Sequence, residues 1–205
     1  MTRILRTTVA LATLIPAAWS ANVLSQSDRD FAMSSLHASR KVFLDSVANL
    51  TDAQWNFKAA PDRWSIAECA EHIAISEDFI AGVAKQTLAA PAAPEKMLPA
   101  EQARAKDEKL LQMVPNRSQK FQAPEPIKPT HRFKTPQEAV DHFKESRDTN
   151  IAYVEKTADP LREHFSKHPA AGDLDAYEWM LLMSGHTERH TMQILEVKAD
   201  PGYPR

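Results

Sequence analysis

The 205-residue sequence has little glycine and almost no cysteine. It contains 4 glycines against 14 prolines, so the turns of a β-sandwich, a β-barrel or a phosphate-binding loop would be hard to build. Its single cysteine, Cys69, excludes an intramolecular disulfide and a cysteine-rich zinc site. Beyond the N-terminal segment the sequence has no run of 18 apolar residues, so we expect no membrane span in the body of the chain.

An excess of positive charge is also missing. Lysine and arginine total 25 against 27 aspartates and glutamates, which gives a formal net charge of −2. Nucleic-acid binding needs a basic surface, so we expect no nucleic-acid partner. The hydrophobic fraction of 43% is high enough for a folded core, and the length fits one domain rather than a disordered chain.

The N-terminal segment has the pattern of a secretory signal peptide. Arg3 and Arg6 form a basic head, the apolar run TTVALATLIPAA follows, and small residues end the segment. We expect residues 1–20 to be cleaved off near Ser20, which leaves a domain of residues 21–205 in the periplasm or outside the cell. The alternative is an N-terminal helix that stays buried against the domain.

Apolar residues recur at steps of three and four along much of the chain, which is the period of an amphipathic helix. Ser65-Ile66-Ala67-Glu68 and Thr135-Pro136-Gln137-Glu138 are capping boxes that begin two of the helices. Residues 161–168 are expected to add one or two helical turns, and no strand is expected. The fold class is therefore all-α, a four-helix bundle with a long excursion between its second and third main helices. The predicted helices cover residues 28–50, 65–90, 100–114, 135–159 and 174–197, and residues 115–129 form an extended proline-rich segment.

Three of the eight histidines are predicted to point into the bundle core. At 100° per residue, His186 and His190 lie 40° apart on the last helix, on the same side as Ile194. On the second helix His72 shares a face with Phe79, which we expect to be buried. Three neutral imidazoles that leave coordination positions open suit a zinc ion, with nickel or iron(II) as alternatives. Core histidines held only by hydrogen bonds are the other interpretation.

Two further side chains are candidates for catalysis. Glu68 lies one turn before His72 and could act as a general base, although it also completes the cap of its helix. Arg147 falls on the apolar stripe of its helix, where it needs a partner such as Glu68, a substrate carboxylate or an end of the proline-rich segment, unless its head reaches solvent. His164 and His168 are also four residues apart, but we expect them to be a surface pair.

The run Trp64-Ser65-Ile66-Ala67-Glu68 with His72, followed by Gly185-His186-Thr187-Glu188-Arg189-His190, resembles the DinB-like superfamily. This group includes YfiT-type metal hydrolases and thiol-dependent transferases, and the resemblance covers about residues 36–198. It implies a four-helix bundle, often dimeric, in which three histidines hold a divalent metal ion at one end of the core. Carried over by position, the metal ligands would be His72, His186 and His190.

Together these patterns predict an exported metal-binding protein, and an enzyme of hydrolase or thiol-transferase type that acts on an unidentified small molecule. A homodimer is the assembly that the resemblance suggests. The alternatives are a metal site without catalysis and a metal-free interaction bundle. If the three histidines share a metal, their nitrogens should lie within about 3–4 Å of one another even in a metal-free structure.

Overall fold

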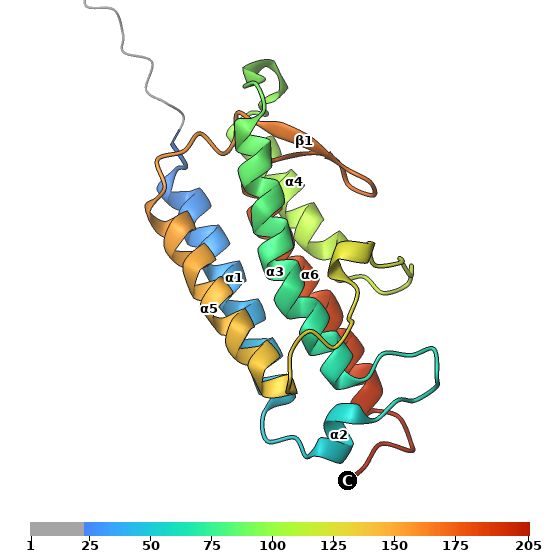
Figure 1. Cartoon of the computed structure of the whole chain (residues 1–205). Coiled ribbons are helices and arrows are strands. Elements are labelled where there is room, and N and C mark those ends of the chain that lie inside the picture. Colours follow the sequence, from blue (N-terminus) through green and yellow to red (C-terminus); the bar gives the residue numbers. More distant parts are fainter. Residues whose placement is uncertain (1–22) are drawn as a thin grey trace, which may run out of the picture.

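A computed structural model describes residues 23–205 of the chain (Figure 1). The predicted signal peptide, residues 1–20, lies outside the described residues. None of the helices in the described part is long and apolar enough to cross a membrane. The helices are α1 (Gln26–Val47), α2 (Asp52–Asn56), α3 (Ile66–Ala89), α4 (Ala100–Met113), α5 (Pro136–Lys156) and α6 (Ala176–Lys198); η1 (Pro94–Lys96) and η2 (Glu125–Ile127) are short 3₁₀ helices, and β1 (Phe165–His168) and β2 (Gly172–Asp175) are strands.

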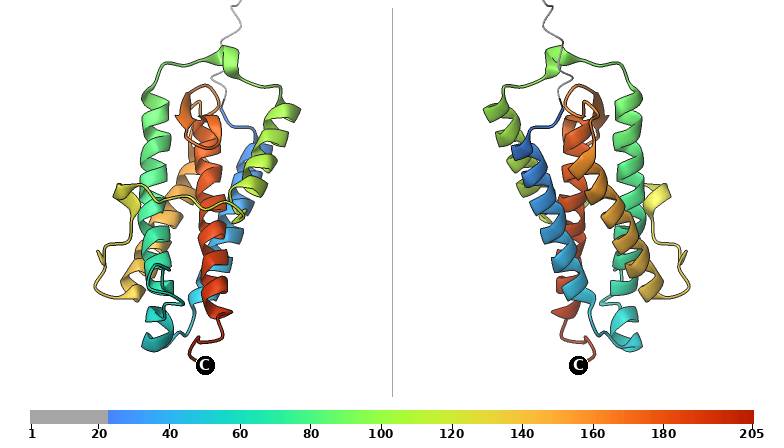
Figure 2. Two further views of the ribbon diagram at one scale, coloured as in Figure 1. Left: turned by 90° about the vertical axis from the view of Figure 1, so that its right-hand side faces the viewer. Right: turned by 90° about the vertical axis from the view of Figure 1, so that its left-hand side faces the viewer.

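The four long helices α1, α3, α5 and α6 form the predicted bundle (Figure 1). Helix α6 packs against α1 and α3, and α5 packs against the same two helices from the other side. The excursion between α3 and α5 rises over one end of the bundle, descends through α4 along α6, and crosses back to α3 (Figure 2). All-α architecture, the four-helix bundle and the excursion are therefore confirmed.

Capping residues set the beginnings of these helices. The Ser65 hydroxyl accepts the Glu68 N–H at 3.2 Å, and the Glu68 carboxylate accepts the Ser65 N–H at 2.7 Å, which is the predicted capping box of α3. Thr135 caps α5, but the carboxylate of Glu138 accepts the N–H of Lys134 instead of closing the box. Helix α6 has a capping box of its own that we did not predict.

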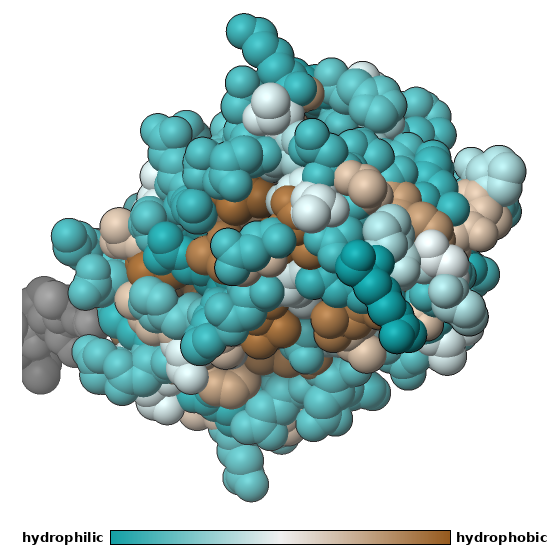
Figure 3. Space-filling model, turned by 90° about the horizontal axis from the view of Figure 1, so that it is seen from below, coloured by the Kyte–Doolittle hydropathy of each residue, from teal (hydrophilic) through white to brown (hydrophobic). Residues whose placement is uncertain are grey.

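The core continues toward the end of the bundle where α2 and the C-terminus lie. Phe43 and Phe143 meet edge to face there, with ring centroids 4.8 Å apart, beside buried Ile73 and Ile194. Seen from this end, hydrophobic residues gather in the middle and hydrophilic residues surround them (Figure 3). Phe79 does not join the core as predicted; it keeps 38% of its surface exposed because it lies at the margin of the buried face of α3.

The helical turns predicted over residues 161–168 are absent, and a two-stranded hairpin of β1 and β2 takes their place. Pro169 cannot continue a helix, and Gly172 supplies the turn with a backbone φ of +77°. The hydroxyl of Ser166 lies 2.9 Å from the indole nitrogen of Trp179, which donates to it and ties the hairpin to α6. Four-residue strands are too short to produce a clear alternating pattern, so the sequence did not reveal them.

Candidate metal centre

The side chains of His72, His186 and His190 converge between α3 and α6. The Nε2 atom of His72 lies 3.2 Å from Nε2 of His186 and 3.1 Å from Nε2 of His190. One nitrogen from each of the three rings falls within a group no wider than 4.8 Å. Residues 114 positions apart thus meet at one level of the bundle, as predicted.

Hydrogen bonds at the far side of two rings determine which nitrogens carry protons. The Nδ1 atom of His72 lies 2.6 Å from the carbonyl oxygen of Ile127, and since a carbonyl only accepts, Nδ1 carries the hydrogen. The Nδ1 atom of His190 lies 3.0 Å from Oε1 of Gln193, which also accepts from Arg117 at 3.3 Å. Both rings therefore present an unprotonated Nε2 toward the common centre.

Loss of contact with solvent favours the neutral form of the three rings. Loss of solvation lowers the pKa of His72 to about 4 and holds the pKa of His186 and His190 well below its ordinary value. Nearby cations act in the same direction, Arg189 on His186 and Arg117 on His190. Neutral imidazoles are the form that binds a metal ion.

Three converging neutral imidazoles form a donor set that fits a divalent cation. The lone pairs on Nε2 of His72 and His190 face each other at 3.1 Å, an unfavourable arrangement that a cation between them would relieve. Within residues 23–205 no other histidine, cysteine, aspartate or glutamate joins the three. A set of three protein ligands leaves a coordination position for water or substrate, as catalytic zinc sites do.

Trp64, on the turn before α3, forms a wall of this site. Its ring centroid lies 4.9 Å from that of His72 and 5.9 Å from that of His190. The indole therefore lies against two of the three imidazoles.

The two side chains predicted to take part in catalysis make their hydrogen bonds to groups other than the three histidines. Glu68 is outside the 4.8 Å group, and its two oxygens accept from the Ser65 N–H and from Lys58. Partial burial alone would raise the pKa of Glu68, but these two hydrogen bonds lower it. The carboxylate thus serves the cap of α3, the competing role considered from the sequence.

Arg147 is fully buried, and its partner is Glu77 rather than Glu68 or the proline-rich segment. Its Nε and Nη2 atoms donate to the two oxygens of Glu77 at 2.6 and 2.8 Å. The remaining donors reach Ser39 at 2.8 Å and Thr187 at 2.9 Å, together with backbone carbonyls. All of its hydrogen-bonding capacity is used inside the core, where it joins α5 to α1, α3 and α6.

His164 and His168 do not come together as a pair. The Nδ1 atom of His164 lies 2.7 Å from the carbonyl oxygen of Ala90, whereas Nδ1 of His168 accepts the N–H groups of Ala170 and Ala171. Each ring therefore fixes local backbone near the hairpin.

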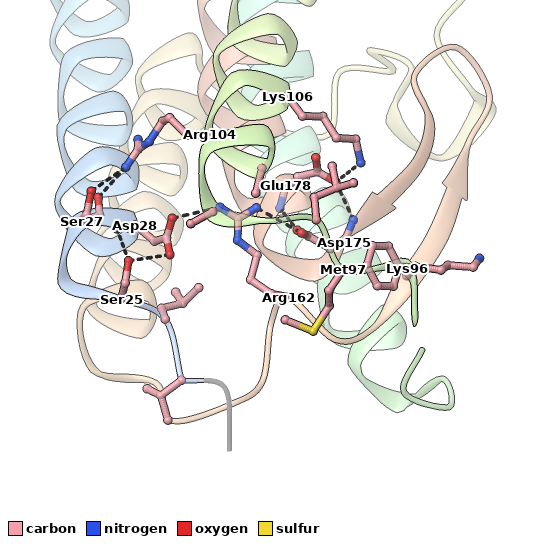
Figure 4. Close-up of a pocket in the computed structure, with 16 residues that line it drawn as sticks. Ser25, Ser27, Asp28, Lys96, Met97, Arg104, Lys106, Arg162, Asp175 and Glu178 are labelled. Atoms are coloured by element: carbon pink, nitrogen blue, oxygen red, sulfur yellow. Dashed lines mark hydrogen bonds and ion pairs between the residues drawn. The ribbon is translucent and has the colours of Figure 1, made fainter. Parts of the chain in front are cut away.

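A second polar cluster lies at the end of the bundle where α6 begins, around a cavity of about 530 Å³ (Figure 4). Arg162 stands between Asp28, Asp107 and Asp175, with nitrogen–oxygen distances of 3.0, 2.6 and 3.1 Å. Lys106 pairs with buried Glu178 in the same way at 2.7 Å. These charges satisfy one another, and the cluster holds the N-terminal ends of α1 and α6 to the excursion.

The fold and the site define a class of protein, a four-helix bundle with three histidines gathered on two adjacent helices. The sequence profile described as the DinB superfamily matches residues 35–194, and the chain belongs to this superfamily. An uncharacterized protein of Bacillus subtilis, YuaE, is 24% identical over 166 residues, which span 81% of this chain and 96% of YuaE. The fold is similar to that of YfiT from Bacillus subtilis, described as a probable metal-dependent hydrolase with an unusual four-helix bundle topology. That similarity has a TM-score of 0.58 at 15% sequence identity and covers 88% of this chain and 91% of YfiT.

Proposed function

We propose that this protein is a metal-dependent hydrolase of small molecules, with zinc as the metal. The observation that carries the proposal is the convergence of three histidine nitrogens, two of them unprotonated, without a fourth protein ligand among the described residues. A metal site that only stabilises a fold is normally closed by a fourth protein ligand, whereas hydrolytic sites keep that position open. The fold similarity to YfiT supports the same reaction class.

His72, His186 and His190 would hold the ion. A divalent ion bound there acts as a Lewis acid that polarises a substrate carbonyl or phosphoryl group and activates water for hydrolysis. Ile127 and Gln193 keep two of the rings in the binding tautomer, and Trp64 lies against both of these rings. Glu68, one turn from His72, remains the proposed general base, and it would have to release the Ser65 N–H or Lys58 to act.

The charges around the site favour a substrate that carries a negative group. Arg117 and Arg63 both pair with Glu196, at 2.6 and 3.6 Å, so two cations share one carboxylate. Arg189 adds a third positive charge beside His190, and its pKa is lowered by burial and by Arg117. Neutral ligands leave the charge of a bound divalent ion uncompensated, which increases the positive potential further.

Metal-dependent turnover tests the proposed function. Chelator-treated protein would be reloaded with zinc, nickel, iron(II) or cobalt, and assayed on carboxylic esters, phosphate esters, amides and a thiol-transfer pair. We expect hydrolysis that needs the metal and falls at least about 100-fold in His186→Gln, because a metal ligand is lost. His142→Gln is the matched control, since this ring pairs with Asp78 outside the site. Turnover that survives metal removal would contradict the proposal, and stoichiometric metal without turnover would support a non-catalytic site.

We also propose that the protein is exported, on the basis of its N-terminal sequence. Intact-mass analysis of protein recovered from its own host should show the loss of about 20 residues, the usual size of such a segment. An unprocessed N-terminus on the exported protein would contradict cleavage near Ser20.

A further inference from the structure

The excursion returns to the bundle across the metal centre. We call residues 114–132 the strap; they leave α4, pass over α6 and reach α3 (Figure 2). There the carbonyl oxygen of Ile127 lies 2.6 Å from Nδ1 of His72. The strap includes η2, and the rest of residues 114–132 forms neither helix nor strand. Its position therefore depends on side chains of the helices beneath it.

Glu71 holds one end of the strap. Its Oε1 atom accepts the N–H groups of Thr130 and Arg132 at 2.9 and 3.0 Å, and its Oε2 atom accepts the N–H of His131 at 3.0 Å. His131 has a left-handed backbone with φ of 60°, a conformation unusual for a residue other than glycine. Three successive N–H groups thus bind one carboxylate, which is only 5% exposed. Charge-assisted hydrogen bonds of this kind are among the stronger ones in proteins.

Arg189 holds the other end. Its guanidinium donates to the carbonyl oxygens of Val114 at 3.2 Å, of Gln119 at 2.5 Å, and of Asn116. It also lies 5.3 Å from the ring centroid of Phe121, over which its positive charge is favourably placed. The strap is therefore held by two oppositely charged side chains that bind its backbone.

Both holding residues directly precede a predicted metal ligand. Glu71 precedes His72 on α3, and Arg189 precedes His190 on α6. Successive side chains on a helix point about 100° apart, so each pair sends one side chain to the metal centre and the other to the strap.

The strap also orients the ligands. The carbonyl of Ile127, in η2, accepts the Nδ1 hydrogen of His72. Arg117, also in the strap, donates to Gln193, which in turn accepts from Nδ1 of His190. Such partners of a ligating histidine fix its tautomer and direction, and their loss commonly weakens metal binding about 10- to 100-fold.

We propose that Glu71 is a positioning residue of the metal centre, which holds the strap so that Ile127 fixes His72 in its metal-binding orientation. This inference rests on the proposed function, because it assumes that the histidines bind zinc. Binding free energies are reciprocal, so zinc must stabilise the strap as much as the strap stabilises zinc binding. Occupancy of the site thereby controls the order of the segment that crosses it.

Two measurements on the full chain test the coupling. Zinc affinity would be measured by competition with a chromogenic chelator for wild type, Glu71→Gln and Glu138→Gln. Glu138→Gln is the control, because it makes the same chemical change in a carboxylate that accepts the Lys134 N–H outside the strap. Amide hydrogen exchange of residues 127–132 would be followed with and without zinc. We expect Glu71→Gln to weaken zinc binding at least about 10-fold, and zinc to slow exchange in wild type.

If Glu71 had only a structural role, Glu71→Gln would lower the melting temperature. It would then change neither the zinc affinity of the folded protein nor the d–d absorption of the cobalt-substituted site. Two results would overturn the inference while the proposed function stands. One is equal zinc affinity in wild type and Glu71→Gln, and the other is an amide exchange rate of residues 127–132 that zinc does not change in wild type. Failure of wild type to bind zinc overturns the proposed function itself. If Glu71→Gln does not fold, two measurements replace it: the amide hydrogen exchange of wild type with and without zinc, and the zinc affinity of Arg189→Lys.

Discussion

Replacement of Arg147 by methionine should destabilise the protein strongly without removing its metal. Arg147 and Glu77 are 0% and 1% exposed and share two hydrogen bonds of 2.6 and 2.8 Å. Without the guanidinium, Glu77 stays buried as an anion whose remaining donor is Asn150, at 3.1 Å. Breaking a buried ion pair by removing one partner costs about 3–5 kcal/mol, a large part of the roughly 5–15 kcal/mol that holds a typical domain together.

The double variant Arg147→Met/Glu77→Leu separates the cost of an unpaired charge from the value of the pair. Replacing both members of a buried ion pair by apolar residues is often close to neutral, so we expect the double variant to regain at least half of the lost stability. The partial cost comes from the hydrogen bonds that Arg147 donates to Ser39 and Thr187, which are lost; Ser39 keeps its bonds with Leu36 and Ser184.

Urea unfolding followed by circular dichroism, with chelator present, measures these free energies for wild type, both single variants and the double variant. A cost below about 1 kcal/mol for Arg147→Met, or a double variant as unstable as the sum of the singles, would refute the reasoning. Zinc content of the folded Arg147→Met protein should equal that of wild type, because the hydrogen bonds of Arg147 go to Glu77, Ser39, Thr187 and backbone carbonyls rather than to the three histidines. A loss of zinc would give Arg147 a role in the site.

Two further predictions follow from burial. The contribution of His72 to the stability of the metal-free protein should rise between about pH 4 and pH 6.5 and then level off, because the unfolded chain binds a proton that folded His72, with its pKa near 4, does not. For His72 this amounts to roughly 2–3 kcal/mol. Urea unfolding at several pH values should therefore show that the unfolding free energy of His72→Gln rises less steeply with pH than that of wild type, and an equal slope would contradict the prediction. Burial also raises the pKa of Cys69 far above its ordinary value, so a thiol reagent such as dithionitrobenzoate should modify it only after denaturation, and rapid reaction in native protein would be inconsistent with the structure.

The sequence was sufficient for the bundle and for the three histidines because both depend on helical periodicity. The long helices end within a few residues of the predicted positions, since apolar stripes and capping residues such as Ser65 mark them directly. His72, His186 and His190 were found because residues one turn apart on an apolar face must point into the core. Their meeting at one level follows from helices that pack side by side.

Other features were missed because the sequence pattern does not carry them. Glu77 was not identified as the partner of Arg147, since the sequence does not show which residue of another helix a buried charge will face. The support of His72 comes from the backbone carbonyl of Ile127, and a backbone atom has no residue-type signal. The three backbone N–H groups bound by Glu71 depend on a left-handed His131, which no composition rule would suggest. The Arg162 cluster joins four separate segments and leaves no local pattern.

Metal content is the most direct test of the central claim that His72, His186 and His190 form one metal site. Protein purified without chelator or an affinity-tag metal would be analysed by inductively coupled plasma mass spectrometry, as wild type, His190→Ala and His142→Ala. We expect one divalent ion per chain in wild type and in His142→Ala, whose ring pairs with Asp78 outside the site. His190→Ala should retain almost none. Equal metal content in wild type and His190→Ala would contradict the account.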